Sequence, residues 1–426
     1  MINIISKFDC CGCGACIQAC PKHCISFNED EQGFFYPLVD IGLCVDCHLC
    51  EKVCPTLNQA SPRGPLEVYA AKNPNEIIRL ASSSGGIFTM LAEVVISRGG
   101  VVFGARFNEE WEVVHDYTET IEGLSVFRGS KYVQSRIGSC FQQAKEFLLS
   151  GREVLFSGTP CQIAGLKLFL RKDYENLLTV DIVCHGVPSP KIWRDYLKYI
   201  MRPKGAAGKN TVLSSLNEAP VLTGISFRDK STGWKKFGFS VRMKSALKAD
   251  ENSVFGPLNP IHEEIILHET LDINIYMQGF LKNLYLRPSC YACDVKCGRS
   301  HSDLTIADFW GIDRFFPGYD DDKGVSLVLV NSSKGMSYFS SLAVNKTSVA
   351  YELALAGNPS LEHSVAIPKL YEQFWSIYGT EGIPSISLIC SRLRPSRIKY
   401  ITISVVRKIL GKRVIKLLKS IKNKMI

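Results

Sequence analysis

The sequence has no long apolar segment and no recognisable export signal. No window of about 18 uncharged apolar residues occurs, although 46% of the 426 residues are hydrophobic. A membrane-spanning helix is therefore not expected. The first residues, MINIISKFDC, lack the basic stretch, apolar core and cleavage site of a secretion signal. We therefore expect a globular protein of the cytoplasm.

Two further patterns are missing. No G-x-G-x-x-G motif follows a strand with an acidic residue downstream, so a nicotinamide-binding Rossmann unit is not indicated. A general excess of positive charge is also lacking. The net charge of +9 comes from residues 391–426, which hold 12 Lys and Arg and no Asp or Glu, whereas the rest of the chain has 38 basic and 41 acidic residues. The body of the protein is therefore not expected to bind nucleic acid.

The basic segment 391–426 has apolar residues near helical spacing. These are Val406, Ile409, Leu410, Val414, Leu417, Leu418 and Ile421. Basic residues fill the gaps between them, a pattern typical of an amphipathic helix that lies on anionic lipid. We predict a basic C-terminal helix in peripheral contact with the inner face of a membrane. A solvated or docked terminal helix is the alternative.

Cysteine, by contrast, is abundant, with 17 residues in all. Cys10, Cys13, Cys16 and Cys20 follow the spacing C-x₂-C-x₂-C-x₃-C and precede a proline. A second run, Cys44, Cys47, Cys50 and Cys54, repeats the pattern 34 positions later. This run is the signature of two-cluster bacterial ferredoxins, in which the fourth cysteine binds the other cluster. We therefore predict two [4Fe–4S] clusters, one held by Cys10, Cys13, Cys16 and Cys54 and the other by Cys44, Cys47, Cys50 and Cys20.

Disulfides and zinc are the other common roles of closely spaced cysteines. A disulfide framework suits secreted chains, and the amino-terminal residues indicate a reducing compartment instead. Zinc sites usually show two C-x₂-C pairs rather than two quartets that end in proline. Two cysteines lie outside the pattern: we expect Cys11 to point away from the ligands and Cys24 to pack as a small apolar residue.

The chain divides into several regions by composition. Residues 1–57 are predicted to form an α+β ferredoxin-like module with a hairpin between the two cysteine runs. The polar segment NQASPRGP, residues 58–65, is predicted to be a linker. Residues 66–390 are predicted to form a second domain, with an N-terminal part at about 66–145 and a C-terminal part at about 150–330. The tail 391–426 follows.

The second domain alternates strand and helix patterns. We predict strands at 68–72, 101–107, 153–158, 177–184 and 326–331, and helices at 87–98, 139–151, 159–170, 191–201 and 277–286. Repeated strand–loop–helix units favour an α/β domain with a largely parallel sheet. Two runs at 224–229 and 235–244 have the pattern of antiparallel strands and would form an insertion.

A third group of cysteines follows predicted strands. Cys161 and Cys184 each stand at the carboxyl end of a strand, where parallel strands of one sheet bring their ends to the same edge. Cys290 and Cys293 form a C-x₂-C pair that could supply two more thiolates to a third [4Fe–4S] cluster. Cys297 could replace one of the four. The alternative is that Cys161 and Cys184 are buried apolar residues and that the pair binds zinc or nothing.

Two short segments have features of a phosphate site. SSSGG, residues 82–86, precedes a predicted helix, so its amides and hydroxyls could hold a phosphate; an N-cap with a tight turn is the alternative. RGSKYVQS, residues 128–135, places Lys131 between small and aromatic residues, which suits a pyrophosphate or a ring. A solvated surface lysine would explain that pattern equally well.

Six motifs occur in the order SSSGG, GSKYVQS, GTPCQIAGLK, DIVCHGVPSP, CYAC and SDLTIADFWGI. Over about residues 66–330 this combination resembles the coenzyme F-420 hydrogenase/dehydrogenase beta-subunit family of flavin- and iron–sulfur-dependent oxidoreductases. The resemblance implies FAD in the α/β domain and supports the third cluster. It makes Ser83, Ser84, Gly85, Gly86, Lys131, Tyr132, Gly158 and Thr159 the candidate flavin contacts. Asp308 and Trp310 would line the site, with core packing as their alternative role.

The resemblance predicts a cytoplasmic oxidoreductase that passes electrons from a low-potential donor such as ferredoxin, through the clusters, to FAD. His185, beside Cys184, is a candidate proton donor, although a lone histidine can also be structural. Relatives use several acceptors, so the acceptor would be a small molecule or a lipid-linked glycan of surface polysaccharide synthesis. Two alternatives remain open: an electron-transfer subunit of a larger complex that reduces or oxidises coenzyme F-420, and a glycan-assembly protein with structural clusters and no catalysis.

Overall fold

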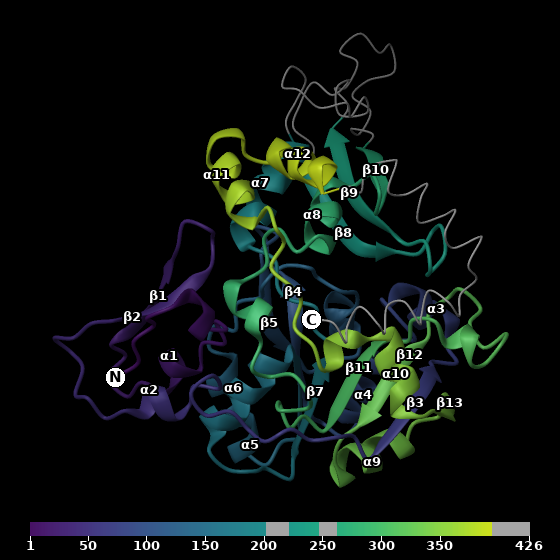
Figure 1. The fold of residues 1–426 in the computed structure, drawn as a ribbon. Helices are drawn as coiled ribbons and strands as arrows, with labels where there is room; N and C mark the ends of the chain where they lie inside the picture. Colours follow the sequence, from purple (N-terminus) through teal and green to yellow (C-terminus); the bar gives the residue numbers. More distant parts are fainter. Residues whose placement is uncertain (202–220, 247–261, 394–426) are drawn as a thin grey trace, which may run out of the picture. The chain divides into compact units, whose positions relative to one another are not determined.

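The computed structural model describes residues 1–201, 221–246 and 262–393 (Figure 1). The chain separates into two compact units, Met1–Pro368 and a second unit that begins at Lys369. The predicted domain 66–390 spans this boundary. The second unit contains α11, Tyr371–Glu381, and α12, Pro384–Arg392, which pack against each other. From residue 394 on, the predicted basic helix lies outside the described residues.

The ferredoxin module has the predicted hairpin and two short helices (Figure 1, purple). Strands β1, Ile25–Glu29, and β2, Phe35–Val39, pair antiparallel, and helices α1, Ala15–Ala19, and α2, Leu49–Lys52, carry cysteines of the two runs. Asp30 closes the hairpin, because its Oδ1 accepts hydrogen bonds from the amides of Gln32 and Phe34 at 3.0 and 2.8 Å.

The main sheet has eight strands in the order β13-β3-β12-β11-β7-β6-β4-β5. Their bounds are β3 Glu67–Lys72, β4 Val101–Phe107, β5 Val113–Thr118, β6 Val154–Gly158, β7 Leu177–Ile182, β11 Leu304–Asp308, β12 Ser326–Val330 and β13 Asn345–Ser348. The four central strands β11, β7, β6 and β4 are parallel neighbours. The parallel arrangement of β4, β6 and β7 agrees with the sequence prediction, whereas β11 was not predicted as a strand. The strands at both edges pair antiparallel, so the sheet is mixed. Strand β5 pairs antiparallel with β4 because the short connection between them forms a hairpin, whereas a parallel pair needs a longer crossover.

Helices cover both faces of this sheet because successive side chains of each strand point to opposite sides. Phe156 of β6 packs with α5, Cys140–Leu149, and α6, Pro160–Leu170, whereas the preceding Leu155 packs with α4, Ile87–Ser97, and α9, Ser333–Ser340. The remaining helices of the unit are α3 Glu76–Ala81, α7 Pro190–Ile200, α8 Ile275–Leu281 and α10 Tyr351–Gly357. The α5–α6 core also contains Cys13 and Ala15 of the ferredoxin module, which therefore packs on that face.

The predicted antiparallel insertion is present as a separate three-stranded sheet in the order β10-β9-β8. Strands β8, Val221–Asp229, and β9, Gly238–Ala246, confirm the sequence prediction, whereas β10, His262–Thr270, was not predicted. Trp193 of α7 packs against Phe227 of β8, with ring centroids 5.0 Å apart. The insertion is thus anchored to the main domain by aromatic contacts.

The predicted linker 58–65 contains no helix or strand and is held to the main domain at Arg63. The Arg63 amide donates a hydrogen bond to the Cys297 carbonyl at 3.0 Å, and its guanidinium donates to the Ser302 carbonyl at 2.6 Å. None of the helices in the described ranges is long and apolar enough to cross a membrane.

Candidate functional site

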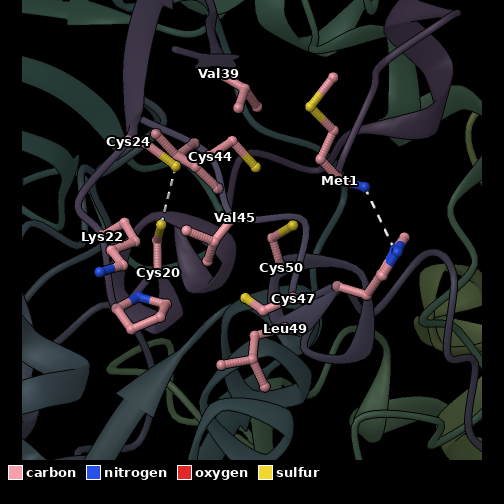
Figure 2. A pocket seen from close by; sticks show the side chains of 13 residues that line it. Met1, Cys20, Lys22, Cys24, Val39, Cys44, Val45, Cys47, Leu49 and Cys50 are labelled. Carbon is pink, nitrogen blue, oxygen red and sulfur yellow. Dashed lines mark hydrogen bonds between the residues drawn. The ribbon is translucent and has the colours of Figure 1, made fainter. Parts of the chain in front are cut away.

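Four cysteines of the ferredoxin module line one cavity. They are Cys20, Cys44, Cys47 and Cys50, with Met1, Val45 and Leu49 among the other residues around the cavity (Figure 2). Cys20 belongs to the first run by sequence and joins the second run in space, as the spacing predicted. The Ile2 amide donates a hydrogen bond to Cys50 Sγ at 3.2 Å. Cys47 is the exposed member of the set, whereas Cys20 and Cys50 are buried.

A fifth thiol lines the same cavity. Cys24 is buried within the apolar cluster that contains Ile2 and Ile25, which agrees with its predicted packing role. Its Sγ also lies 3.3 Å from Cys20 Sγ (Figure 2). Cys24 is therefore in contact with a predicted cluster ligand, which the spacing alone did not indicate.

The first predicted ligand set is also assembled. Burial, together with the charges of Cys10 and Cys54, raises the pKa of the Cys16 thiol to about 12. Burial likewise raises the pKa of Cys54, with a contribution from Cys10. Cysteines gathered in this way can all become thiolates only when a cation binds them, so the donor set fits an iron–sulfur cluster.

The geometry does not resemble a single-ion site. Within the described ranges, no three Cys, His, Asp or Glu side chains come close enough together to bind one metal ion. A zinc site needs such convergence, because all its ligands bind one ion. In a cubane, each thiolate binds a different iron, so the four sulfurs lie further apart.

The third predicted group of cysteines also comes together. Burial raises the pKa of Cys184 to about 12, with smaller contributions from Cys161 and Cys293. Burial also raises the pKa of Cys290, to which the charges of Cys184, Cys161 and Cys293 contribute. Cys297, the predicted competitor, directs its Sγ toward the Glu362 carbonyl at 3.7 Å.

Local structure explains why Cys161 and Cys184 meet. β6 and β7 are adjacent and parallel, so the residues that follow them reach the same edge of the sheet. Thr159 and Gln162 form a capping box at the start of α6, with Pro160 at its first position. Cys161 is therefore held in the first turn of α6. The C-x₂-C pair is supplied by the short helix η4, Pro288–Ala292, and its C-cap Cys293.

Cys11 does not point away from the ligands, so that expectation was wrong. Its thiol lies close enough to Cys13 and Cys161 for both to influence its pKa, which Cys13 and burial raise. Cys11 therefore lies between the first ferredoxin set and the third group of cysteines. The sequence placed Cys11 and Cys161 150 positions apart, and only the packing of α6 against the ferredoxin module brings them into contact.

A cavity of about 730 Å³ lies beside the third cysteine group. Its size is within the range of sites for small molecules and cofactors. Seven of the eight candidate flavin contacts line it: Ser83, Ser84, Gly86, Lys131, Tyr132, Gly158 and Thr159. Cys184, His185, Asp308 and Trp310 line it too. Residues that the sequence indicated in separate motifs therefore share one cavity.

Gly85 has a different position from the one predicted. It does not line the cavity. A Cβ at this residue would lie 2.4 Å from the Ala71 carbonyl oxygen and 2.7 Å from the Ser326 amide nitrogen. Glycine is needed here because the loop packs tightly against β3 and β12, rather than because a ligand approaches it.

Several cavity residues carried no recognisable sequence signal. Arg228 of β8 pairs with Asp308 at 2.6 Å and donates to the Tyr132 hydroxyl at 3.2 Å. Its buried Nε has no hydrogen-bond partner among the described residues. Phe280 stacks on Tyr132 with ring centroids 4.7 Å apart. The insertion and α8 thus complete an aromatic and cationic wall.

The electrostatics of the cavity centre on Lys131 and His185. Burial lowers the pKa of Lys131 to about 7, and its Nζ donates to the carbonyls of Arg128 and Gly129 at 3.1 and 3.2 Å. Burial also lowers the pKa of His185, whose Nε2 lies 2.6 Å from Asn283 Oδ1. The cavity therefore contains an amino group, that of Lys131, whose protonated form an anionic ligand would stabilise. It also contains the weakly basic imidazole of His185.

Two family models match parts of the chain. Residues 9–58 match the family described as 4Fe-4S dicluster domain. Residues 151–352 match the family described as the C terminus of the coenzyme F420 hydrogenase/dehydrogenase beta subunit. The Ser/Gly loop and Lys131 precede the second match.

Two relatives come from Methanocaldococcus jannaschii. A coenzyme F420-dependent sulfite reductase is 26% identical over 45% of this chain and 30% of its own length. An uncharacterized ferredoxin is 38% identical over 12% of this chain and 68% of its own length. The chain thus covers less than a third of the reductase.

A solved structure of the F420-reducing [NiFe] hydrogenase complex from Methanosarcina barkeri is similar at 15% identity. It has a TM-score of 0.42 and covers 70% of this chain and 90% of the other. The two family matches agree with the cysteine patterns and with the assembled ligand sets. Residues 151–352 therefore belong to the coenzyme F420 hydrogenase/dehydrogenase beta-subunit family, and residues 9–58 form a 4Fe-4S dicluster ferredoxin module.

Proposed function

We propose that this protein is an iron–sulfur flavoprotein oxidoreductase that takes electrons from a low-potential donor, such as ferredoxin, and delivers them to an acceptor in the 730 Å³ cavity. The main support is that Cys184 belongs to the third cysteine group and also lines the cavity that contains the candidate flavin contacts. When bound, the clusters supply single electrons and FAD converts them into two-electron chemistry.

Each of the three cysteine groups has a place in this proposal. The exposed Cys47 puts the second set nearest to solvent, where a donor protein can approach. The first set lies against α6, and the third group adjoins the cavity. The chain thus holds its thiols in a series that begins at the surface and ends at the cavity.

The cavity residues would bind and orient FAD. The hydroxyls of Ser83 and Ser84 and the Lys131 ammonium suit the phosphates, because they combine neutral donors with a cation. Tyr132 and Phe280 form an aromatic wall suited to a flat ring. His185 is the candidate proton donor, because its lowered pKa makes its protonated form a stronger acid. Asn283 holds its ring in place.

A second candidate function has its own support. The chain covers only 30% of the F420-dependent sulfite reductase that it resembles. It could therefore act as an electron-transfer subunit that passes electrons to, or receives them from, a separate catalytic protein that uses coenzyme F420. Surface polysaccharide synthesis remains a proposal for the acceptor, with the basic tail as its only support.

Cofactor analysis of anaerobically purified protein tests both functions. We expect about 12 iron and 12 sulfide ions per chain, as three cubanes of four, together with bound FAD. Reduced ferredoxin should then bleach the flavin absorbance. Protein with intact clusters and no flavin, even after incubation with FAD, would contradict the flavoprotein proposal and favour the electron-transfer subunit.

A further inference from the structure

Arg287 is a buried arginine at the junction of the ferredoxin module and the main sheet. Its side chain is 0% exposed. Its Nε donates to the Cys10 carbonyl at 2.7 Å, and its Nη2 donates to the Phe35 carbonyl at 2.9 Å. Its Nη1 donates to Gln134 Oε1 at 3.0 Å. The guanidinium is therefore held rigidly, with its orientation fixed from three sides.

The charge of Arg287 has no carboxylate partner in the part of the chain that the structure describes. A buried and unpaired cation is strongly unfavourable. The ring of Tyr36, 4.4 Å from the guanidinium carbon, gives partial compensation. A guanidinium cannot lose its proton under ordinary conditions, so another source of negative charge is needed.

The ionisable neighbours of Arg287 are thiols from both sides of the junction. Its Nη2 donates to Cys10 Sγ at 3.5 Å. Cys11 and Cys290 also raise its pKa through their charges. Cys10 belongs to the first ferredoxin set and Cys290 to the third group. By its hydrogen bonds, the Arg287 guanidinium therefore lies against the first proposed cluster site.

We propose that Arg287 is a counter-charge for the first ferredoxin site and raises the reduction potential of the cluster held by Cys10. The inference rests on the proposed function, because it requires that cluster. Reduction adds one negative charge, which a nearby buried cation and a hydrogen bond to the ligand sulfur both stabilise. Arg287 is thus a positioning residue that acts on electron flow through charge rather than by contact with a substrate.

The second ferredoxin set provides an internal reference. Cys20, Cys44, Cys47 and Cys50 line a cavity in which Arg287 takes no part. A change at Arg287 should therefore shift the potential of one ferredoxin cluster and leave the other nearly unchanged. A general loosening of the module would shift both.

The test is a redox titration of the anaerobically purified full chain, followed by electron paramagnetic resonance. Arg287→Gln should make reduction of the first cluster at least tenfold less favourable, a downward shift of about 59 mV for one electron. Arg287→Lys keeps the charge and should retain most of the potential. Gln134→Glu places a carboxylate beside the unchanged Arg287 and should also lower it. This variant decides the question if Arg287→Gln does not fold.

A matched control is Arg194→Gln. Arg194 also lies at the module junction, but it pairs with Glu29 and Glu112, so its removal should leave the potential unchanged. The inference is overturned if Arg287→Gln keeps its iron content and shows unchanged potentials. If Arg287→Gln does not fold, the same result in Gln134→Glu overturns it. An equal loss in Arg287→Lys and Arg287→Gln would also overturn it, because hydrogen bonds and not charge would then be responsible. If the wild-type protein takes up no clusters on reconstitution with iron and sulfide, the proposed function is overturned as well.

Discussion

The pH dependence of flavin binding provides a sensitive test of the cavity, because it depends on one lysine. Burial lowers the pKa of Lys131 from 10.5 to about 7, so much of this side chain is neutral in the ligand-free protein above neutral pH. An anionic diphosphate favours the protonated form. Binding should therefore take up a proton, and FAD affinity should fall as the pH rises above about 7.

The magnitude follows from linkage. For uptake of one proton, the dissociation constant rises by up to about tenfold per pH unit between the pKa of the free protein and that of the complex. Titration calorimetry in two buffers of different ionisation enthalpy measures the proton uptake directly. Lys131→Met should weaken binding at pH 6.5 more than at pH 9, whereas Lys131→Arg should remove the pH dependence, because arginine stays charged.

The pH dependence of protein stability provides a second measurement, and it should have the opposite sign to the pH dependence of FAD affinity. Between about pH 7 and 10.5, the unfolded chain binds more protons at Lys131 than the folded one does. The free energy of unfolding of flavin-free protein should therefore rise with pH in this window, and Lys131→Met should reduce that rise. Lys198→Met is the control, because Lys198 is 73% exposed. Equal affinity at all pH values in wild type and Lys131→Met would refute the role given to Lys131.

Three further predictions concern the clusters and the tail. The double variant Cys161→Ser/Cys290→Ser should lower the iron content from about 12 to about 8 per chain, whereas Cys297→Ser should leave it at the wild-type level. Equal iron in the wild type and in both variants would contradict the prediction of a third cluster. Cys13→Ser or Cys47→Ser should strongly slow ferredoxin-driven reduction of the flavin while chemical reduction of the flavin survives, and an unchanged ferredoxin-driven rate would show that electrons arrive by another route. Deletion of residues 391–426 should abolish co-sedimentation with anionic vesicles, because each basic residue near such a surface contributes roughly 1 kcal/mol; the full chain should bind less well as salt rises, and equal binding to neutral vesicles would contradict this electrostatic role.

The sequence predicted those features that depend on short spacings or on neighbouring strands. The C-x₂-C-x₂-C-x₃-C signature of two-cluster ferredoxins was sufficient to assign Cys20 to the second ferredoxin set, and Cys20 lines the same cavity as the other cysteines of that set. The position of Cys161 and Cys184 at the same edge of the sheet followed from the expectation that β6 and β7 are parallel neighbours. In both cases a local pattern determines which residues meet, so no knowledge of distant packing was needed.

The features that were missed depend on packing between distant segments. Gly85 stands in a loop that has the pattern of a phosphate site, yet strands β3 and β12 require the glycine. Arg228 reaches the cavity from the antiparallel insertion, and nothing in its local sequence distinguishes it from a surface arginine. Arg287 likewise gains its importance only from burial beside Cys10. Such roles are encoded by tertiary contacts and not by motifs.

Helix α6 has a consequence for how the two modules stay coupled. Cys161 and Gly165 are four residues apart on this helix, so they lie on one face with a rise of about 6 Å between them. A Cβ at Gly165 would lie 3.0 Å from Cys13 Sγ, so the bare glycine backbone seats the ferredoxin module beside the third cysteine group. One turn of a rigid helix, rather than the length of segment 58–65, therefore sets the distance between the first ferredoxin set and the third cysteine group. Lengthening that segment should leave this distance unchanged, and under the proposed function the fused module would act as a ferredoxin that need not dissociate between turnovers.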